Sequence, residues 1–338
     1  MNSLKPNFSH IYLEKGAEEY SLTKLALDKF SKSKIIIIDH YKDFFNRSNQ
    51  DFQVQKLSMN LILAKKSSPF LYPASEMVQE FGTPNVFYNT PILNCLYNCD
   101  YCFLQGMYNS GNLVLFVNEN DFMSSIQKKL ISLKTSSDPM IVAISYNTDI
   151  MAMENILPLA SRWIDFARNQ KHLVIEIRTK SALFALIEKV KPSEQIILSW
   201  TLSPEIISAK FESTSPPLKN RLSSAASAVE KGWQVRLCFD PVILFEGWLD
   251  IYTAFFNEVF NKIDSKKIRD VTIGVFRMNK DFYKRIKKRE PTSELFYQDY
   301  EIKDGVVSLE KKVRINALKK VKKVLEKYLP ENKILTWM

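Results

Sequence analysis

Residues 94–105 read N-C-L-Y-N-C-D-Y-C-F-L-Q and hold three of the four cysteines in a chain of 338 residues. The spacing of Cys95, Cys99 and Cys102 can bring their thiols to one metal centre. Thiolate ligands select zinc, copper(I) or iron–sulfur clusters. A closed zinc site takes four protein ligands, whereas three cysteines on a 4Fe–4S cube leave one iron open for a small molecule.

The chain offers few residues that could complete a zinc site. Its three histidines, His10, His40 and His172, stand alone without metal-ligand spacing and are typical of surface or core histidines. Cys238 would reach the cysteine stretch only by crossing the predicted sheet or barrel. The spacing C-x-x-x-C-x-x-C, with an aromatic residue before the last cysteine, is too specific for an accidental triplet. Zinc and an iron–sulfur cluster both remain open at this point.

Composition predicts a soluble globular protein, with 46% hydrophobic and 25% charged residues. Purely apolar runs such as residues 35–38 are too short to cross a membrane. The N-terminus has no basic stretch followed by an apolar core, so we expect no secretory signal. Four cysteines, three of them clustered, argue against a disulfide framework and favour a cytoplasmic protein with reduced thiols.

Basic residues are concentrated near the end of the chain. The formal net charge is +10, and Lys and Arg gather in residues 280–289 and 311–327. This distribution fits a polyanionic partner such as nucleic acid. The second cluster also fits a solvated helix face, because Ile315, Leu318, Val321 and Leu325 share the opposite face of a predicted helix over 313–328.

Strand-like and helix-like segments alternate through the middle of the chain. Apolar, β-branched runs occur at residues 86–93, 141–145, 173–178, 196–201, 234–239 and 271–276. Amphipathic stretches at 121–134, 150–169 and 221–231 lie between them. Continuous apolar runs suit parallel strands that are covered on both faces, and their alternation with helices predicts a parallel α/β sheet or barrel.

We expect three segments. Residues 1–82 form an N-terminal α/β lobe with one clear strand at 34–39, and residues 83–280 form the barrel. Residues 281–338 form a basic segment in which Asp304 and Gly305, flanked by alternating apolar residues, predict a two-residue hairpin before the final helix.

The cysteine stretch resembles the signature of radical S-adenosylmethionine (SAM) enzymes, with Tyr101 before the last cysteine. This resemblance implies a TIM-like partial (β/α)6 barrel and a 4Fe–4S cluster held by Cys95, Cys99 and Cys102. In that family the open iron binds the amino and carboxylate groups of SAM. The reduced cluster then cleaves SAM to a 5′-deoxyadenosyl radical. A reducing protein such as flavodoxin or ferredoxin is implied as a partner, and the oligomeric state is left open.

A narrower resemblance extends in order along most of the chain, to the spore photoproduct lyase family. The motifs that carry it, besides the cysteine stretch and Arg221, are L-V-L-F-V-N at 113–118, I-S-Y-N-T-D at 144–149, I-E-I-R-T-K-S at 175–181, L-S-W-T-L-S-P-E at 198–205, F-E-S-T at 211–214, K-G-W-Q-V at 231–235, D-P-V-I at 240–243, E-G-W at 246–248, F-R-M at 276–278 and R-E-P at 289–291. The resemblance implies a lyase that repairs a thymine dimer, spore photoproduct, in DNA.

The same resemblance assigns roles to single residues. Together with Tyr101, the positions that match SAM contacts are Thr148, Asp149, Lys180 and Thr201. Tyr101 also matches a tyrosine of the family's hydrogen relay. From the residues alone, Asp149 and Lys180 also read as an ordinary ion pair. Arg277 and Arg289 could contact DNA phosphates or serve as solvated residues.

Two positions depart from the family pattern. Tyr146 stands where the family has its hydrogen-donor cysteine, and Phe103 replaces a relay tyrosine. A phenol can supply a hydrogen atom, so Tyr146 is the first candidate donor and Cys238 the second, although a buried free cysteine is usually structural. These departures leave two alternatives open. One is a radical SAM enzyme acting on another nucleic-acid lesion or modification, and the other is a non-catalytic nucleic-acid-binding protein with a structural metal site.

Overall fold

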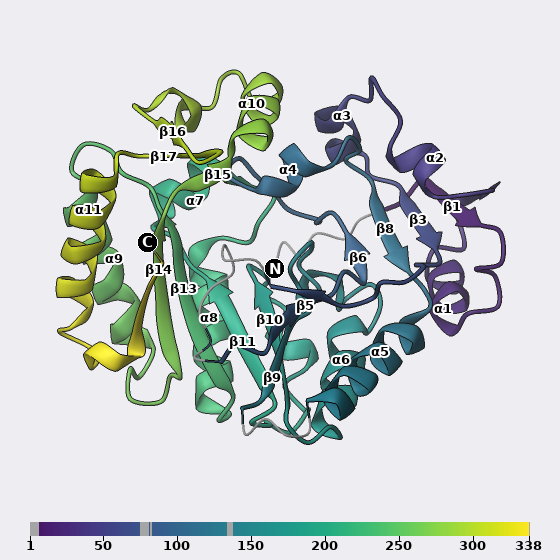
Figure 1. Cartoon of the computed structure of the whole chain (residues 1–338), viewed down its shortest axis with the longest axis horizontal. Coiled ribbons are helices and arrows are strands. Elements are labelled where there is room, and N and C mark those ends of the chain that lie inside the picture. The colour runs from purple at the N-terminus through teal and green to yellow at the C-terminus, as the bar shows by residue number, and fades with distance from the viewer. Residues whose placement is uncertain (1–6, 75–80, 82, 134–137, 338) are drawn as a thin grey trace.

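A curved, mostly parallel sheet forms the centre of the protein (Figure 1). The structure is a computed structural model that describes residues 7–74, 81, 83–133 and 138–337. The strands of this sheet run in the order β18-β14-β13-β11-β10-β9-β5-β4. Their bounds are β4 (Tyr72–Pro73), β5 (Val86–Tyr88), β9 (Met140–Ala143), β10 (Leu173–Thr179), β11 (Ile196–Thr201), β13 (Gln234–Val242), β14 (Asp270–Val275) and β18 (Ile334–Trp337).

The six predicted strands are confirmed as the neighbouring parallel strands β5, β9, β10, β11, β13 and β14. The sheet ends at β4 and β18 and does not close, so the predicted partial barrel is confirmed. The predicted extent of the first strand was wrong. β5 ends at Tyr88, and residues after Pro91, which cannot donate a ladder hydrogen bond, form β6 (Ile92–Leu93) in another sheet.

Helices follow most of the strands. They are α5 (Glu119–Ser132), α6 (Leu159–Arg168), α7 (Glu205–Phe211), α8 (Leu218–Glu230) and α9 (Trp248–Lys262), with the short turns η1 (Met151–Met153) and η2 (Phe184–Leu186). The predicted helix over 150–169 divides into η1 and α6, because Pro158 lacks an N–H and disfavours a helical residue before it. The predicted end of α5 at residue 134 lies outside the described residues.

The N-terminal lobe is built on a second sheet, ordered β2-β1-β3-β8-β6. Its remaining elements are β1 (His10–Glu14), α1 (Ser21–Lys29), β2 (Lys34–Ile38), α2 (Lys42–Phe45), α3 (Phe52–Leu57), β3 (Leu61–Ala64) and β8 (Leu113–Phe116). The predicted boundary at residue 82 lies outside the described residues. β6 and β8 come from the predicted barrel segment but pair within this sheet, and one apolar core runs through both sheets.

The C-terminal segment contains the predicted hairpin and helix. Its elements are β15 (Arg277–Asn279), α10 (Lys280–Arg289), η3 (Glu294–Tyr297), β16 (Glu301–Lys303), β17 (Val306–Ser308), α11 (Lys311–Leu325) and η4 (Glu331–Lys333). Asp304 and Gly305 have φ values of 49° and 78°, which suit the turn of a two-residue hairpin. β17 pairs with β16 and β15, so the hairpin is attached directly to the end of the barrel.

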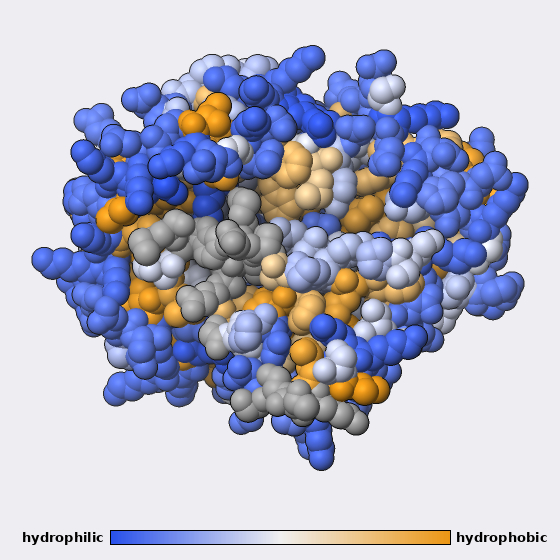
Figure 2. Space-filling view, viewed as in Figure 1, coloured by the Kyte–Doolittle hydropathy of each residue, from blue (hydrophilic) through white to orange (hydrophobic). Residues whose placement is uncertain are grey.

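The cysteine stretch lies in a crossing between the two sheets. It contains β7 (Asn98–Cys99), which pairs with β12 (Glu212–Ser213), and the short helix α4 (Phe103–Met107). In Figure 1, α4 lies beside α10 and above the carboxyl ends of the barrel strands, the edge at which α/β proteins build their sites. Figure 2 shows mostly hydrophilic side chains over α10 and α11 and apolar ones around α4. No helix among the described residues is long and apolar enough to span a membrane.

Candidate active site

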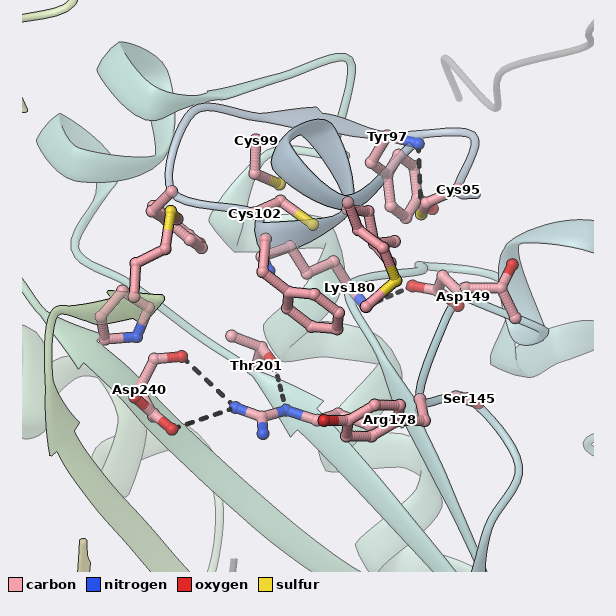
Figure 3. Close-up of a pocket in the computed structure, with 18 of the residues that line it drawn as sticks. Cys95, Tyr97, Cys99, Cys102, Ser145, Asp149, Arg178, Lys180, Thr201 and Asp240 are labelled. Carbon is pink, nitrogen blue, oxygen red and sulfur yellow. Dashed lines mark hydrogen bonds and ion pairs between the residues drawn. The ribbon is translucent and has the colours of Figure 1, made fainter. Parts of the chain in front are cut away.

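A cavity of about 350 Å³ lies between the cysteine crossing and the carboxyl ends of the barrel strands (Figure 3). Most of the predicted site residues line it. They are Cys95, Cys99, Tyr101, Cys102, Tyr146, Thr148, Asp149, Lys180, Thr201 and Arg277. Segments far apart in sequence therefore meet here because parallel strands end at one edge of their sheet.

The first cysteine is positioned by its neighbour Asn94. Asn94 is buried and has a left-handed φ of 75°, a conformation that asparagine tolerates better than most residues. Its side-chain amide donates to the carbonyls of Ser110 (2.9 Å) and Asn112 (3.1 Å), and its Oδ1 accepts from the Cys95 N–H at 3.0 Å. The crossing is thereby pinned to the N-terminal sheet immediately before Cys95.

A buried ion pair supports the cysteine crossing at Cys99 and Tyr101. Cys99 lies opposite Glu212 in the β7–β12 pair, and Glu212 contacts Arg221 at 2.6 Å, with both side chains fully buried. Glu212 also accepts hydrogen bonds from Tyr101 Oη and from Ser203 Oγ (3.0 Å). Burial alone would raise the pKa of Glu212, but Arg221 and Lys180 outweigh it and lower that pKa. Glu212 is thus held as a carboxylate under the cysteine crossing.

The three cysteines are unpaired, and all three line the same cavity. Burial raises the pKa of Cys95 to about 12 and also raises the pKa values of Cys99 and Cys102. A bound metal centre stabilises thiolates that burial otherwise disfavours. In the described part of the chain, no group of three or more His, Cys, Asp or Glu is arranged around a single metal ion. Three thiols facing one cavity fit a cluster that binds one ligand per iron and leaves an iron open.

Asp149 and Lys180 do not form the simple ion pair that was one reading of the sequence. Asp149 accepts hydrogen bonds from the backbone N–H of Lys180 (2.7 Å) and of Ala152 (3.0 Å), and from Thr179 Oγ1 (2.8 Å). Burial raises the pKa of Asp149 and these bonds oppose the rise. The Lys180 side chain instead lies 5.1 Å above the ring of Tyr101, which places its ammonium group beside the cysteines.

Sequence reasoning missed a polar cluster on the barrel side of the cavity. Arg178 Nε donates to Thr201 Oγ1 at 3.2 Å, and Asp240 lies 3.7 Å from Arg178 (Figure 3). Asp240 also accepts from Arg277 at 3.0 Å. Glu176 and Ser145 also line the cavity. The available signal was the pair of charged residues, Glu176 and Arg178, inside an otherwise apolar strand, since buried charges need partners or a function.

Tyr146 lies within a row of aromatic rings. Its ring centroid is 4.4 Å from that of Tyr88 and 5.6 Å from that of Phe103, and Tyr88 is stacked on Tyr72 at 5.2 Å. Burial, followed by the neighbouring Tyr146 and Tyr72 phenols, raises the pKa of Tyr88. The row of rings runs from the cavity into β5 and β4.

Two predicted residues lie away from the cavity. Cys238 is fully buried within β13 and does not line the cavity, so this geometry does not support it as a donor. Arg289 donates to the carbonyl oxygens of Gln105 and of Tyr108 (2.9 Å) and stacks on Phe52 at 4.6 Å. Its predicted contact with nucleic acid stays a prediction.

Comparison with known families agrees with this geometry. The family model described as spore photoproduct lyase matches residues 5–336. The chain belongs to the spore photoproduct lyase family. The resemblance inferred from the cysteine stretch and the ordered motifs is thus confirmed.

A curated relative and several solved members of the spore photoproduct lyase family are distant in sequence. The spore photoproduct lyase of Clostridium acetobutylicum is 20% identical over 187 residues, which cover 55% of this chain and 55% of the relative. The match therefore spans about half the length of that relative. Identity at this level leaves room for different residues at individual site positions.

Solved structures of spore photoproduct lyase share the fold almost completely. A cysteine-to-alanine mutant is 16% identical, covers 97% of this chain and 98% of its own, and has a TM-score of 0.83. A spore photoproduct lyase complexed with dinucleoside spore photoproduct is 16% identical, covers 98% and 99%, and has a TM-score of 0.82. A double mutant with bound SAM and dinucleoside spore photoproduct is 16% identical, covers 97% and 98%, and has a TM-score of 0.81.

Proposed function

We propose that this protein is a radical SAM lyase that splits spore photoproduct, a thymine dimer, in DNA. The observation that carries the proposal is the single cavity in which three cysteine thiols meet the strand-end residues Thr148, Lys180 and Thr201. Membership of the spore photoproduct lyase family and the dinucleoside lesion in a solved relative support the substrate.

Cys95, Cys99 and Cys102 would hold a 4Fe–4S cluster. When bound, the cluster supplies the electron that cleaves SAM and so generates the radical that takes a hydrogen atom from the lesion. The ammonium group of Lys180 suits a carboxylate, and the hydroxyls of Thr148 and Thr201 suit the polar groups of SAM. Asp149 orients this side of the cavity by fixing the backbone at Lys180.

Tyr146 is the proposed hydrogen donor. After the bond joining the two thymines breaks, a thymine radical remains. Transfer of a hydrogen atom from the Tyr146 O–H to that radical yields thymine and leaves a Tyr146 phenoxyl radical, so one O–H bond breaks and one C–H bond forms. The support for this role is that Tyr146 lines the cavity at the family's donor position, whereas Cys238 does not line it.

The test uses protein reconstituted anaerobically with iron and sulfide, reduced with dithionite, and given SAM and dinucleoside spore photoproduct in D₂O. Mass spectrometry follows 5′-deoxyadenosine, thymine dinucleoside and its deuterium content. We expect both products, with one deuterium in the repaired thymine, because the O–H of Tyr146 exchanges with solvent. Tyr146→Phe should lose the deuterium, and Cys99→Ala should lose both products.

A second candidate keeps the radical chemistry and changes the lesion. The observation that favours it is the replacement of the family's donor cysteine and relay tyrosine by Tyr146 and Phe103. In the same assay, 5′-deoxyadenosine without thymine would support this candidate and exclude spore photoproduct. Neither product, from protein that carries its cluster, would favour a nucleic-acid-binding protein with a structural metal site.

The partners follow from the same proposal. The lesion would be carried in DNA, and the electron would come from a reducing protein such as flavodoxin or ferredoxin. The four cysteines are free, which fits the cytoplasm, where thiols stay reduced.

A further inference from the structure

Lys56 of helix α3 reaches from the N-terminal lobe to the cysteine crossing. Its side chain is buried, with 8% of the residue exposed. The Nζ atom donates hydrogen bonds to the carbonyl oxygen of Cys95 and to that of Tyr97, the latter at 3.2 Å. The next nearest acceptor is the sulfur of Met59 at 4.0 Å, which is a weak acceptor.

This buried lysine has no acidic partner among the described residues. None of their carboxylates lies within 4.0 Å of Nζ, and every ion pair found there involves other residues. Burial lowers the pKa of Lys56, and the neighbouring thiols of Cys95, Cys102 and Cys99 oppose this shift. Burying a cation without a counterion costs folding free energy. A negatively charged group in the cavity would reduce this cost.

Hydrogen bonds on both sides of helix α3 hold the helix, and with it Lys56, in this position. On one side, Gln55 Oε1 accepts from Ser110 Oγ (2.9 Å) and from the Gly111 N–H (2.8 Å). A Cβ atom on Gly111 would lie 2.6 Å from the carbonyl oxygen of Phe52, so glycine is needed for this close approach. On the other side, Gln53 donates to Gln105 at 3.0 Å.

The same network continues into the crossing. Asn98 Nδ2 donates to Gln53 Oε1 at 2.9 Å, and Gln105 Nε2 donates to the Cys99 carbonyl at 2.8 Å. Helix α3 therefore touches the backbone of the crossing at Cys95, at Tyr97 and, through Gln105, at Cys99. These contacts make α3 a support for two of the three proposed cluster ligands.

We propose that Lys56 is a positioning residue for the iron–sulfur centre, which fixes the backbone at residues 95–97 and supplies the positive charge that balances the thiolate-ligated cluster. A cluster bound by three thiolates gains negative charge on reduction, and a fixed positive charge nearby stabilises the reduced form. Lys56 thereby raises the reduction potential and makes the cluster easier to reduce. The inference rests on the proposed function only in taking the three cysteines as cluster ligands.

The test compares Lys56→Met and Lys56→Arg with the parent protein, and uses exposed Lys32→Met, which removes the same charge from the same lobe, as the control. Three quantities are measured without any lesion substrate. They are the iron retained against a chelator, the midpoint potential of the cluster followed by electron paramagnetic resonance, and the urea midpoint of the cluster-free protein.

For Lys56→Met we expect iron retention to weaken roughly 10- to 100-fold, as for other residues that support metal ligands, and the potential to become more negative. The cluster-free variant should unfold at the same or a higher urea concentration than the parent, because an unpaired buried charge has been removed. Lys56→Arg should restore retention and potential, and Lys32→Met should change neither.

Unchanged retention and potential in Lys56→Met would overturn the inference. A lower urea midpoint of the cluster-free Lys56→Met variant, at an unchanged potential, would also overturn it, because Lys56 would then serve only to stabilise the fold. These readouts separate the inference from the proposed function. If the parent holds a cluster but repairs no spore photoproduct, the proposed substrate fails and the role of Lys56 is still decided.

Discussion

Tyr146 has two neighbouring rings, and only one of them carries a hydrogen atom that could restore the O–H of Tyr146 after it has donated its own. Phe103, at 5.6 Å, has no exchangeable hydrogen, whereas Tyr88, at 4.4 Å, is a phenol. If Tyr146 donates its hydrogen atom as proposed, its phenoxyl radical can take a hydrogen atom from Tyr88, which then carries the radical itself. Tyr72, stacked on Tyr88 at 5.2 Å, extends the row away from the cavity. A hydrogen atom from a thiol in solution, or an electron from a one-electron reductant together with a proton from water, would restore the last phenol.

The Tyr88→Phe substitution should affect later turnovers but not the first. We expect a normal first turnover, because Tyr146 is intact, followed by turnovers that are slower by roughly tenfold, or about 1.4 kcal/mol in barrier. Quenched-flow measurement of thymine formation checks this, with Tyr328→Phe, remote beside Phe260, as the matched control. A variant with unchanged steady-state turnover would exclude Tyr88 from the reloading path.

The ion pair of Glu212 and Arg221 gives a prediction about stability. Both side chains are fully buried, so Glu212→Gln leaves Arg221 without its charge partner and should cost about 3–5 kcal/mol. Urea unfolding of the cluster-free protein measures this loss. Asp39→Asn, in the exposed pair with Lys15, is the control and should leave the urea midpoint unchanged. A similar result for both variants would contradict the structural role given to Glu212.

At the scale of elements, hydrogen bonds hold helix α10 against α4. Arg285 donates to the carbonyl of Gly106 at 2.7 Å, and Arg289 donates to those of Gln105 and Tyr108. These are carbonyls at the end of a helix, where a positive side chain is favourable. A Cβ atom on Gly106 would lie 2.4 Å from that of Phe282, so the two helices touch at backbone distance. The basic C-terminal segment is thus tied to the helix that follows the cysteines.

Glu290, at the end of α10, predicts a pH dependence of stability. Burial and then the charge of Asp100 raise the pKa of Glu290 to about 7 from an ordinary value of 4.5. Between these values the folded protein holds a proton that the unfolded chain releases, so this group's contribution to stability is lost as the pH rises from 4.5 through 7.

The measurement is the urea midpoint of the cluster-free protein at pH 5.5 and pH 8, for the parent and for Glu290→Gln. The parent should lose more stability than the variant between the two values, because the amide does not titrate. Equal pH dependence in the two proteins would show that Glu290 is not the responsible group.

At the scale of the whole molecule, the basic residues divide between two helices. Lys284 and Lys288 are exposed on α10, which lies beside α4 and the cavity, whereas Lys319 and Lys320 are exposed on α11, which packs against α9 and β14. If DNA is held over the cavity, α10 contacts its phosphates and α11 does not.

Binding to duplex DNA at several salt concentrations tests this arrangement. Lys284→Gln together with Lys288→Gln should reduce the slope of log affinity against log salt by about 2, since each phosphate contact contributes roughly 0.9. Lys319→Gln together with Lys320→Gln carries the same change in charge and should leave the slope unaltered. The opposite pattern would indicate that DNA binds over α11 and not over α10.

Arg277 and Arg289, the two predicted DNA contacts, are both engaged within the protein, with Asp240 and with the end of α4 respectively. Sequence places an arginine near a motif but does not reveal which carboxylate or carbonyl it meets. For that reason, any contribution of Arg277 and Arg289 to DNA binding should be compared with that of the exposed lysines of α10.

The sequence by itself determined the alternation of parallel strands and helices, the hairpin and the clustering of three cysteines. These features are local: apolar runs of strand length, the pair Asp304 and Gly305, and three cysteines in one short stretch each specify their own structure. The strand β6 and the division of the helix before Arg168 were missed because Pro91 and Pro158 interrupt runs that otherwise read as continuous.

Only the tertiary structure decided what surrounds the cysteines. Lys56, Glu212 and Arg178 come from three separate elements, and each has a meaning only through a partner brought close by folding. A lysine in a short helix of the N-terminal lobe reads as a surface residue, because its burial depends on packing between segments 39 residues apart. Whether a lysine supports the proposed cluster site or is a solvated surface charge therefore depends on which residues the fold brings close to it, and not on residue type.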